Sequence, residues 1–134
     1  MRDRRLPLLL ASALTALLAT ALLATPLLAM GATAAAPSGL RGVVMRGPIT
    51  PVCREGVPCS APARNTPLVF TRAGRSVKTR TDAIGRYRIA LSPGLWSVHT
   101  AAAPRVGTGI SPSTARVLAG RFRVADFEID TGIR

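Results

Sequence analysis

Two cysteines and one histidine are the residues of this sequence best suited to chemistry. Cys53 and Cys59 lie in a proline-rich stretch, GPITPVCREGVPCSAPARNTP. Redox exchange commonly uses a Cys-x-x-Cys spacing, and a zinc site needs further cysteine or histidine ligands, whereas His99 is the only histidine in the chain. We therefore expect Cys53 and Cys59 to form a structural disulfide that stiffens a loop. Such a loop can also bind a partner, because a rigid scaffold holds it in place.

His99 lacks the neighbours that a catalytic base requires. It follows Ser97 by two residues in a strand-like run, and no serine of the chain is set between the glycines of a nucleophile elbow. We interpret Ser97 and His99 as solvent-facing strand residues. The sequence thus predicts a protein that is no enzyme and needs no metal or cofactor.

Basic residues greatly outnumber acidic ones, with 18 Lys and Arg against 6 Asp and Glu and a net charge of +12. Six basic residues fall on neighbouring predicted strands and turns with only Asp82 among them. These six form a predicted cationic binding face: Arg72, Arg75, Lys78, Arg80, Arg86 and Arg88. Its partners would be acidic cell-wall polymers, polysaccharides or headgroups. The competing interpretation is that the charge only keeps the protein soluble. Nucleic acid is not expected, because no aromatic residues alternate with the arginines as stacking platforms.

The N-terminal segment has the order of a secretory signal. Three arginines within the first five residues precede a nearly uncharged run, 6–36, rich in leucine and alanine. A small-residue site near Ala34 predicts a signal peptide over 1–35 and a mature domain over 36–134. The apolar run approaches the ~20 residues that span a bilayer, so an uncleaved anchor stays open, although Pro26 favours cleavage. We expect a protein that is secreted or held in the extracellular cell envelope, with membrane contact only through an uncleaved segment.

Turn signals divide the rest of the chain into short strands. In the central stretch 81–98, Asp82 and Gly85 set one turn and Ser92-Pro93-Gly94 the next, with alternating apolar residues between and after them. About seven strands at spacings of ~8–12 residues predict an all-β, antiparallel Ig-like or transthyretin-like sandwich, preceded by a signal helix. The predicted strands are 40–46, 67–72, 76–81, 86–91, 96–100, 114–118 and 121–130.

The last predicted strand changes the parity of its apolar residues. Phe122 and Val124 occupy even positions, whereas Phe127 and Ile129 occupy odd ones. To place all four on one face requires a single-residue β-bulge near 125–126, or a strand that passes from one sheet to the other. The whole predicted core is Val43 or Val44, Leu68 or Phe70, Val77, Tyr87, Ile89, Leu91, Trp96, Val98, Val117, Phe122, Val124, Phe127 and Ile129. We interpret Trp96 as a core residue and not as a sugar-stacking platform.

Two motifs resemble the carboxypeptidase-regulatory-like, or transthyretin-like, domains of secreted bacterial proteins. They are Thr81-Asp82-x-x-Gly85-x-Tyr87 and Leu91-x-Pro93-Gly94-x-Trp96-x-Val98, within a resemblance that covers Leu40 to Asp130. It implies a β-sandwich over 36–134. The zinc site of the associated peptidases is not implied, because its histidines are missing here. The chain departs from the family pattern at its second strand, and the cysteine loop looks like an insertion before that strand.

The resemblance and the residues together predict a non-catalytic module of the cell envelope, with a binding or structural role. One alternative is a cationic module for acidic wall polymers or polysaccharide, and related starch-binding-like domains imply polysaccharide as a ligand class. Another alternative is an inhibitor that inserts the stiff loop between Cys53 and Cys59 into a protease cleft. No particular ligand follows from the sequence.

Overall fold

A computed structural model describes residues 31–134, so most of the expected signal peptide, and any anchor formed by it, lies outside the described residues. Thr33–Arg134 forms one compact unit. This unit is built from β-strands in two sheets, which confirms the predicted all-β sandwich. Its strands are β1 Gly39–Gly47, β2 Ala61–Pro62, β3 Pro67–Arg72, β4 Arg75–Arg80, β5 Arg86–Ala90, β6 Gly94–His99, β7 Ile110–Ser111, β8 Thr114–Val117, β9 Phe122–Val124 and β10 Phe127–Asp130. In this described part, no helix is long and apolar enough to cross a membrane.

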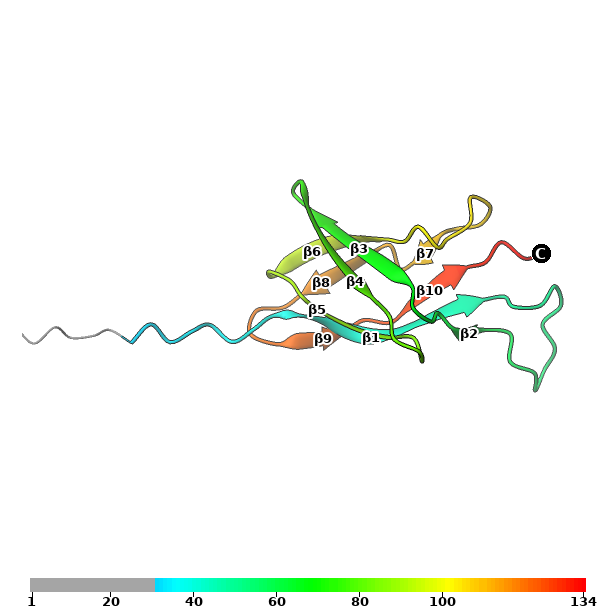
Figure 1. Cartoon of the computed structure of the whole chain (residues 1–134), viewed down its shortest axis with the longest axis horizontal. Helices are drawn as coiled ribbons and strands as arrows, with labels where there is room; N and C mark the ends of the chain where they lie inside the picture. The colour runs from blue at the N-terminus through cyan, green and yellow to red at the C-terminus, as the bar shows by residue number, and fades with distance from the viewer. Residues whose placement is uncertain (1–30) are drawn as a thin grey trace, which may run out of the picture. The chain divides into compact units, whose positions relative to one another are not determined.

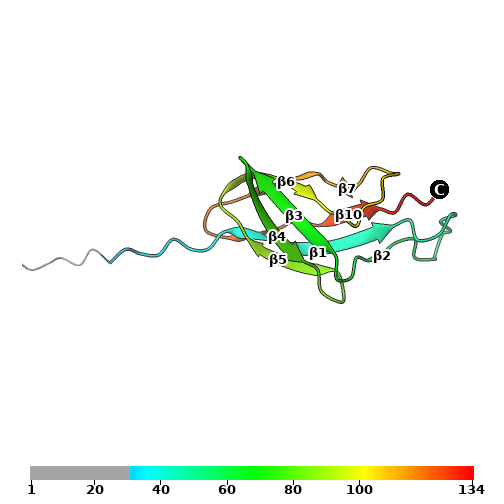
Figure 2. The same cartoon turned by 45° about the horizontal axis from the view of Figure 1, so that its top comes forward.

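β1 is the axis of the larger sheet. On one side it pairs antiparallel with β5 and, near its end, with β2. On the other side it pairs parallel with β9 and β10, and β7 then pairs with β10. The smaller sheet is antiparallel throughout, in the order β4-β3-β6-β8. Figures 1 and 2 show β3 and β4 crossing β1 at a steep angle, with β4 next to β5.

The turn after Thr81 follows its predicted chemistry. The Oδ1 atom of Asp82 accepts hydrogen bonds from the backbone N–H groups of Ile84 and Arg86, each at 2.9 Å. Gly85 has a φ of +80°, and a β-carbon there would lie 2.6 Å from the carbonyl oxygen of Val44. Only glycine therefore allows this turn to lie against β1. The buried Thr81 hydroxyl adds a second tie, since it donates to the carbonyl of Ala63 at 2.5 Å.

The core lies between the two sheets and contains most of the predicted residues. Trp96 is only 2% exposed, and its Nε1 donates to the carbonyl of Ser92 at 2.9 Å, which confirms it as a core residue. The rings of Phe70, Tyr87 and Phe127 meet at centroid distances of 5.7 to 6.1 Å. The other predicted positions that are buried are Val44, Leu68, Ile89, Leu91, Val98, Val117 and Ile129, and Val77 packs at the margin. Buried residues that the prediction omitted are Leu40, Ala63, Ile110 and Ala115.

The prediction for the last strand is wrong. β9 and β10 both pair with β1 at one constant offset, with Arg41 beside Val124 and Val44 beside Phe127, so no extra residue and no change of sheet separates them. The even-numbered residues instead face outward: Val124 is 58% exposed, and Phe122 is half-buried beneath a guanidinium group. The apolar residues change from even to odd positions because this sheet carries apolar residues on both of its faces.

Candidate functional site: an arginine groove

A groove of about 610 Å³ opens on the outer face of the larger sheet, where β1, β5 and β9 lie beside the end of β4. We call it the arginine groove. Its lining residues come from four separate segments: Arg41, Gly42 and Val43; Arg80 and Asp82; Arg86, Tyr87 and Arg88; and Val124 and Asp126. Pairing of β1 with β5 and β9 brings these distant parts of the sequence together.

Strand alternation sends the arginines outward. In β5, Tyr87 and Ile89 are buried while Arg86 and Arg88 are exposed, as expected for a strand with one face on the core. Arg88 is paired with Arg41 of β1, so two guanidinium side chains start from directly opposite positions. Like charges placed in this way repel each other, and a bound anion would relieve the repulsion.

Two arginines of the groove, Arg88 and Arg80, are each held in place by a further contact. The Cζ atom of Arg88 lies 3.5 Å from the centroid of the Phe122 ring, a cation–π contact that orients the guanidinium plane. Arg80 donates from Nη1 to the carbonyl oxygen of Asn65 at 2.6 Å. Phe122, expected in the core, thus serves as a support for Arg88.

The two carboxylates in the groove are bonded to the backbone and leave the arginines without ion pairs. Among residues 31–134, the one ion pair within 4.0 Å joins Asp130 and Arg134. Asp82 bonds the N–H groups of Arg86 and Ile84, and these bonds lower its pKa. Both carboxylates keep oxygen atoms that can accept further hydrogen bonds, since each uses only Oδ1 for the backbone.

The floor of the groove lies where the pairing along one edge of β1 is interrupted, after its pairs with β9 and before its pairs with β10. The Tyr87 hydroxyl donates to the carbonyl of Ala125 at 2.7 Å, and Asp126 Oδ1 accepts the N–H of Val43 at 2.8 Å. The Ala125 carbonyl lies so close to Gly42 that no β-carbon fits there. Burial is the main reason that the pKa of Tyr87 is raised well above its usual value, and the negative charge of Asp126 raises it further. The tyrosine is therefore a neutral hydrogen-bond donor at the base of the groove.

The structure brings together three of the six residues of the predicted cationic face. Arg80, Arg86 and Arg88 line the groove. Arg72 and Arg75 lie at the tip of the β3–β4 hairpin, and Arg72 donates to the carbonyl of Pro93 at 2.5 Å. Lys78 is exposed in the middle of β4. Arg41 was not among the predicted residues of the cationic face, although its place beside the apolar Leu40 in the first strand was a signal for an outward-facing side chain.

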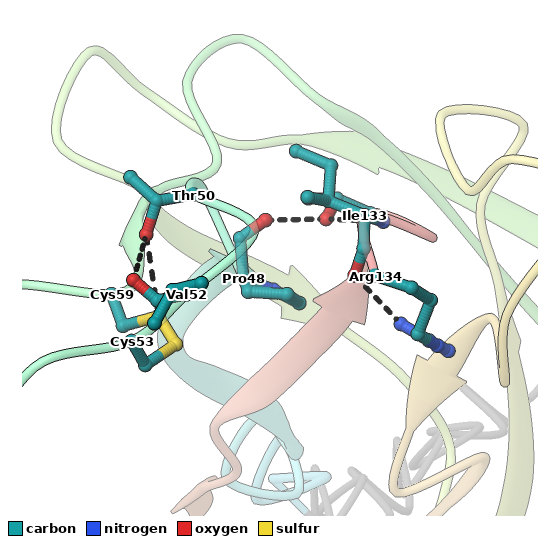
Figure 3. Close-up of a disulfide and its surroundings, with 8 residues drawn as sticks. Pro48, Thr50, Val52, Cys53, Cys59, Ile133 and Arg134 are labelled. Carbon is teal, nitrogen blue, oxygen red and sulfur yellow. Dashed lines mark hydrogen bonds between the residues drawn. A yellow bond between two sulfur atoms is a disulfide. The ribbon is translucent and has the colours of Figure 1, made fainter.

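The cysteines and the histidine lie apart from the groove. Cys53 and Cys59 are disulfide-bonded as predicted, with their Cα atoms 5.4 Å apart (Figure 3). His99 is exposed, and its Nε2 lies 3.3 Å from the Thr71 hydroxyl. No group of three or more His, Cys, Asp or Glu side chains suited to a metal ion occurs within residues 31–134.

No family model, no curated protein and no solved structure matches this chain. The resemblance to carboxypeptidase-regulatory-like domains therefore stays a prediction from the motifs. Any function must be argued from the geometry of the domain, and the arginine groove is where unpaired charge and an open recess coincide.

Proposed function

We propose that this protein is a non-catalytic binding module, secreted or held in the cell envelope, whose arginine groove binds an acidic polysaccharide. The observation that carries the proposal is the pairing of Arg41 with Arg88. The two arginines start from directly opposite positions of neighbouring strands, and no carboxylate of the described chain is within 4.0 Å of either. An anionic group between them would replace repulsion by charge-assisted hydrogen bonds.

The rest of the groove fits a sugar polymer that carries such anions. Guanidinium forks match carboxylate, sulfate and phosphate groups, which acidic polysaccharides repeat along the chain. The second carboxylate oxygens of Asp82 and Asp126 can accept hydrogen bonds from sugar hydroxyl groups. Val124 adds an exposed apolar surface beside them. Because the groove lies open on a sheet face, a long polymer can lie across it and does not have to pass through a closed tunnel.

Support for an extracellular setting comes from the disulfide between Cys53 and Cys59 and from the signal-like order of the first residues. We further propose that the domain belongs with the carboxypeptidase-regulatory-like sandwiches. In favour of this, the Thr81–Tyr87 and Leu91–Val98 motifs lie at turns and core positions of a two-sheet fold.

Affinity electrophoresis through gels that contain polygalacturonate, with neutral dextran as a control gel, tests the groove. We expect the wild-type domain to be retarded by the acidic polymer alone. The double variant Arg41→Gln/Arg88→Gln should bind at least ~10-fold more weakly, since a hydrogen bond to a charged group contributes about 1.5–3 kcal/mol.

The matched control is Arg75→Gln/Lys78→Gln, which removes the same charge from two exposed residues outside the groove. It should keep most of the wild-type retardation. Equal losses in both double variants would show that only overall charge attracts the polymer, and an unchanged groove variant would show that the groove is not the site. Either result overturns the proposal.

A further inference from the structure

Two loops and the C-terminal tail meet at the far end of β1. They are the stapled loop 48–60, the loop 100–109 before β7, and the tail 131–134, and we call this end the loop pole. Figures 1 and 2 both show the two loops and the C-terminus at the same end of the domain, the end toward which the β1 arrow points. The arginine groove begins in the first half of β1 and is a separate feature.

The tail joins the two loops into one surface. Thr131 donates from its N–H to the carbonyl of Gly47 at 2.9 Å and from its hydroxyl to that of Pro48. On the other side, the carboxylate of Asp130 accepts the N–H of Thr108 at 3.0 Å. A β-carbon on Gly132 would lie 2.5 Å from the carbonyl of Val106, so tail and loop are in close contact. The disulfide stiffens the stapled loop.

The loop pole carries the two most exposed large aliphatic side chains of the described residues, Val106 and Val52, and a third that is about as exposed as Val124 of β9. Val106 is 67% exposed in one loop, and Val52 and Val57 are 66% and 57% exposed in the other. Isolated exposed apolar residues are common on proteins, but here they lie in two loops at one end of the domain that both contact the segment 130–132. None belongs to a strand, and none is needed for the core.

Arginines accompany these valines. Arg54 and Arg105 are exposed beside Val52 and Val106 in the sequence. A third, Arg46, is exposed at the end of β1 and lines a hollow of about 240 Å³, together with Pro104 of the loop 100–109 and Thr131 of the tail. Glu55 is the one acidic residue of the two loops, and Asp130 is paired with Arg134. Glu128 also lies at this end, with Oε1 3.3 Å from the position that a β-carbon on Gly47 would take. The surface around the valines therefore carries a small excess of positive charge from Arg46, Arg54 and Arg105.

We propose that the loop pole docks on a lipid bilayer that contains anionic phospholipids. The valines enter the boundary between headgroups and acyl chains, and the arginines contact the phosphates above it, in the way that basic side chains extend toward an interface. Anionic lipid is favoured because it complements the arginines. Docking loses little conformational entropy, since the disulfide and the strand ends already hold the loops.

A bilayer fits this surface better than a protein partner does. Protein interfaces depend on aromatic and arginine anchors that fill pockets in a packed central patch. The loop pole has no aromatic residue, because the five of the chain lie at Phe70, Tyr87, Trp96, Phe122 and Phe127. Short aliphatic side chains on separate loop tips suit a fluid partner that closes around each of them.

The test uses Thr33–Arg134, a compact unit that contains every described strand and the whole core. Co-sedimentation is measured with vesicles of phosphatidylcholine alone and of phosphatidylcholine mixed with phosphatidylglycerol. We expect binding to the mixed vesicles, and at least ~10-fold weaker binding for Val52→Asp/Val106→Asp, because charged side chains resist entry into the bilayer.

The matched control, Ile84→Asp/Leu95→Asp, adds the same charge at aliphatic residues that are 50% and 51% exposed but lie away from the loop pole. It should bind like the wild type. A second measurement places a tryptophan at the loop tip, as Val106→Trp, and records quenching by brominated lipids. Trp96 is shielded in the core and should not be quenched, so quenching reports insertion of the loop.

Absence of vesicle binding, equal losses in both aspartate variants, or an unquenched tryptophan at position 106 each overturns the proposal. Quenching that disappears when Val52→Asp is added supports it. The outcome is independent of the arginine groove, since Arg41→Gln/Arg88→Gln should lose the acidic polymer and keep the vesicles.

Discussion

Tyr87 combines a structural and an electrostatic role at one residue. It is the only tyrosine of the chain, it is 5% exposed, and its hydroxyl holds the Ala125 carbonyl over Gly42. The folded domain therefore favours the neutral phenol, and its pKa is raised above the ordinary value of 10.0. A titration of this single residue should be visible in the stability of the whole domain.

We predict that the free energy of unfolding falls as the pH rises above about 10, the pKa of an unperturbed tyrosine. There the unfolded chain releases the proton while the folded chain keeps it, so rising pH favours unfolding. Urea unfolding followed by Trp96 fluorescence measures the effect. Tyr87→Phe should remove this alkaline loss, at a cost of ~1–2 kcal/mol at neutral pH for the unpartnered carbonyl. An identical alkaline loss in the variant would contradict the prediction.

How well the sequence predicted each residue of the groove depended on the type of that residue. Asp82 and Gly85 revealed their turn because each has a local requirement, a backbone bond and a positive φ. Arg41 could not be assigned to the groove, because its partner Arg88 lies in a strand 47 residues further along. Charge alone grouped Arg72 with Arg88, although the strand pairing separates them.

At the scale of elements, the last strand shows the limit of alternation. Alternating apolar residues predict which face of a strand is buried only when the opposite face of the sheet is fully exposed to solvent. Here the outer face carries Arg88 over Phe122 and the exposed Val124, so apolar residues occur on both faces. Most of the strands, the disulfide and most of the core could be predicted, but the two-residue strands β2 and β7 fall in stretches that were expected to be loops. The parallel pairing of β1 with β9 and β10 could not, because it depends on contacts between distant parts of the chain.

Asp130 connects β10 with both the loop 100–109 and the tail. Its carboxylate accepts bonds from Thr108, Gly132 and Arg134. The Arg134 guanidinium and then the N–H groups of Thr108 and Gly132 lower its pKa well below the ordinary 3.8. The stabilising effect is therefore complete above pH 3.8 and is lost as the pH falls further toward the lowered pKa.

We predict that acid loosens the loop pole before the sheets. Below a pH of about 4, amide hydrogen exchange at Thr108 and Gly132 should accelerate relative to that in β1. Asp130→Asn cannot ionise, so it should show fast exchange at these two amides already at neutral pH. If exchange there is slow and independent of pH in both proteins, the carboxylate does not hold the loops.

At the scale of the whole molecule, β1 separates the two proposed sites. Arg41 lies near its start and Pro48 follows its end, which places the groove and the loop pole about 20 Å apart at ~3.3 Å per residue. A bilayer at the pole would leave the groove open on the outer face of the larger sheet. The sequence had suggested membrane contact only through the N-terminal segment, and the loop pole offers a second contact.

We predict that one molecule binds both partners at once. Vesicles that carry the wild-type Thr33–Arg134 unit should capture labelled polygalacturonate, whereas those carrying Arg41→Gln/Arg88→Gln should not. Added salt should release the polymer first, because charge screening weakens the arginine contacts while the buried valines remain. Release of the protein from the vesicles by the polymer would show that the two sites overlap.

The parallel pairing of β1 with β10 also governs the order in which the domain can form. β1 precedes all the other strands of the described residues, and its partner β10 lies 83 positions later, as in the pair Val44 and Phe127. A chain emerging N-terminus first therefore leaves one edge of β1 unpaired until β9 and β10 have emerged, whether it leaves a ribosome or an export channel. Truncation before Phe127 would make that edge permanent, and the product should aggregate through it.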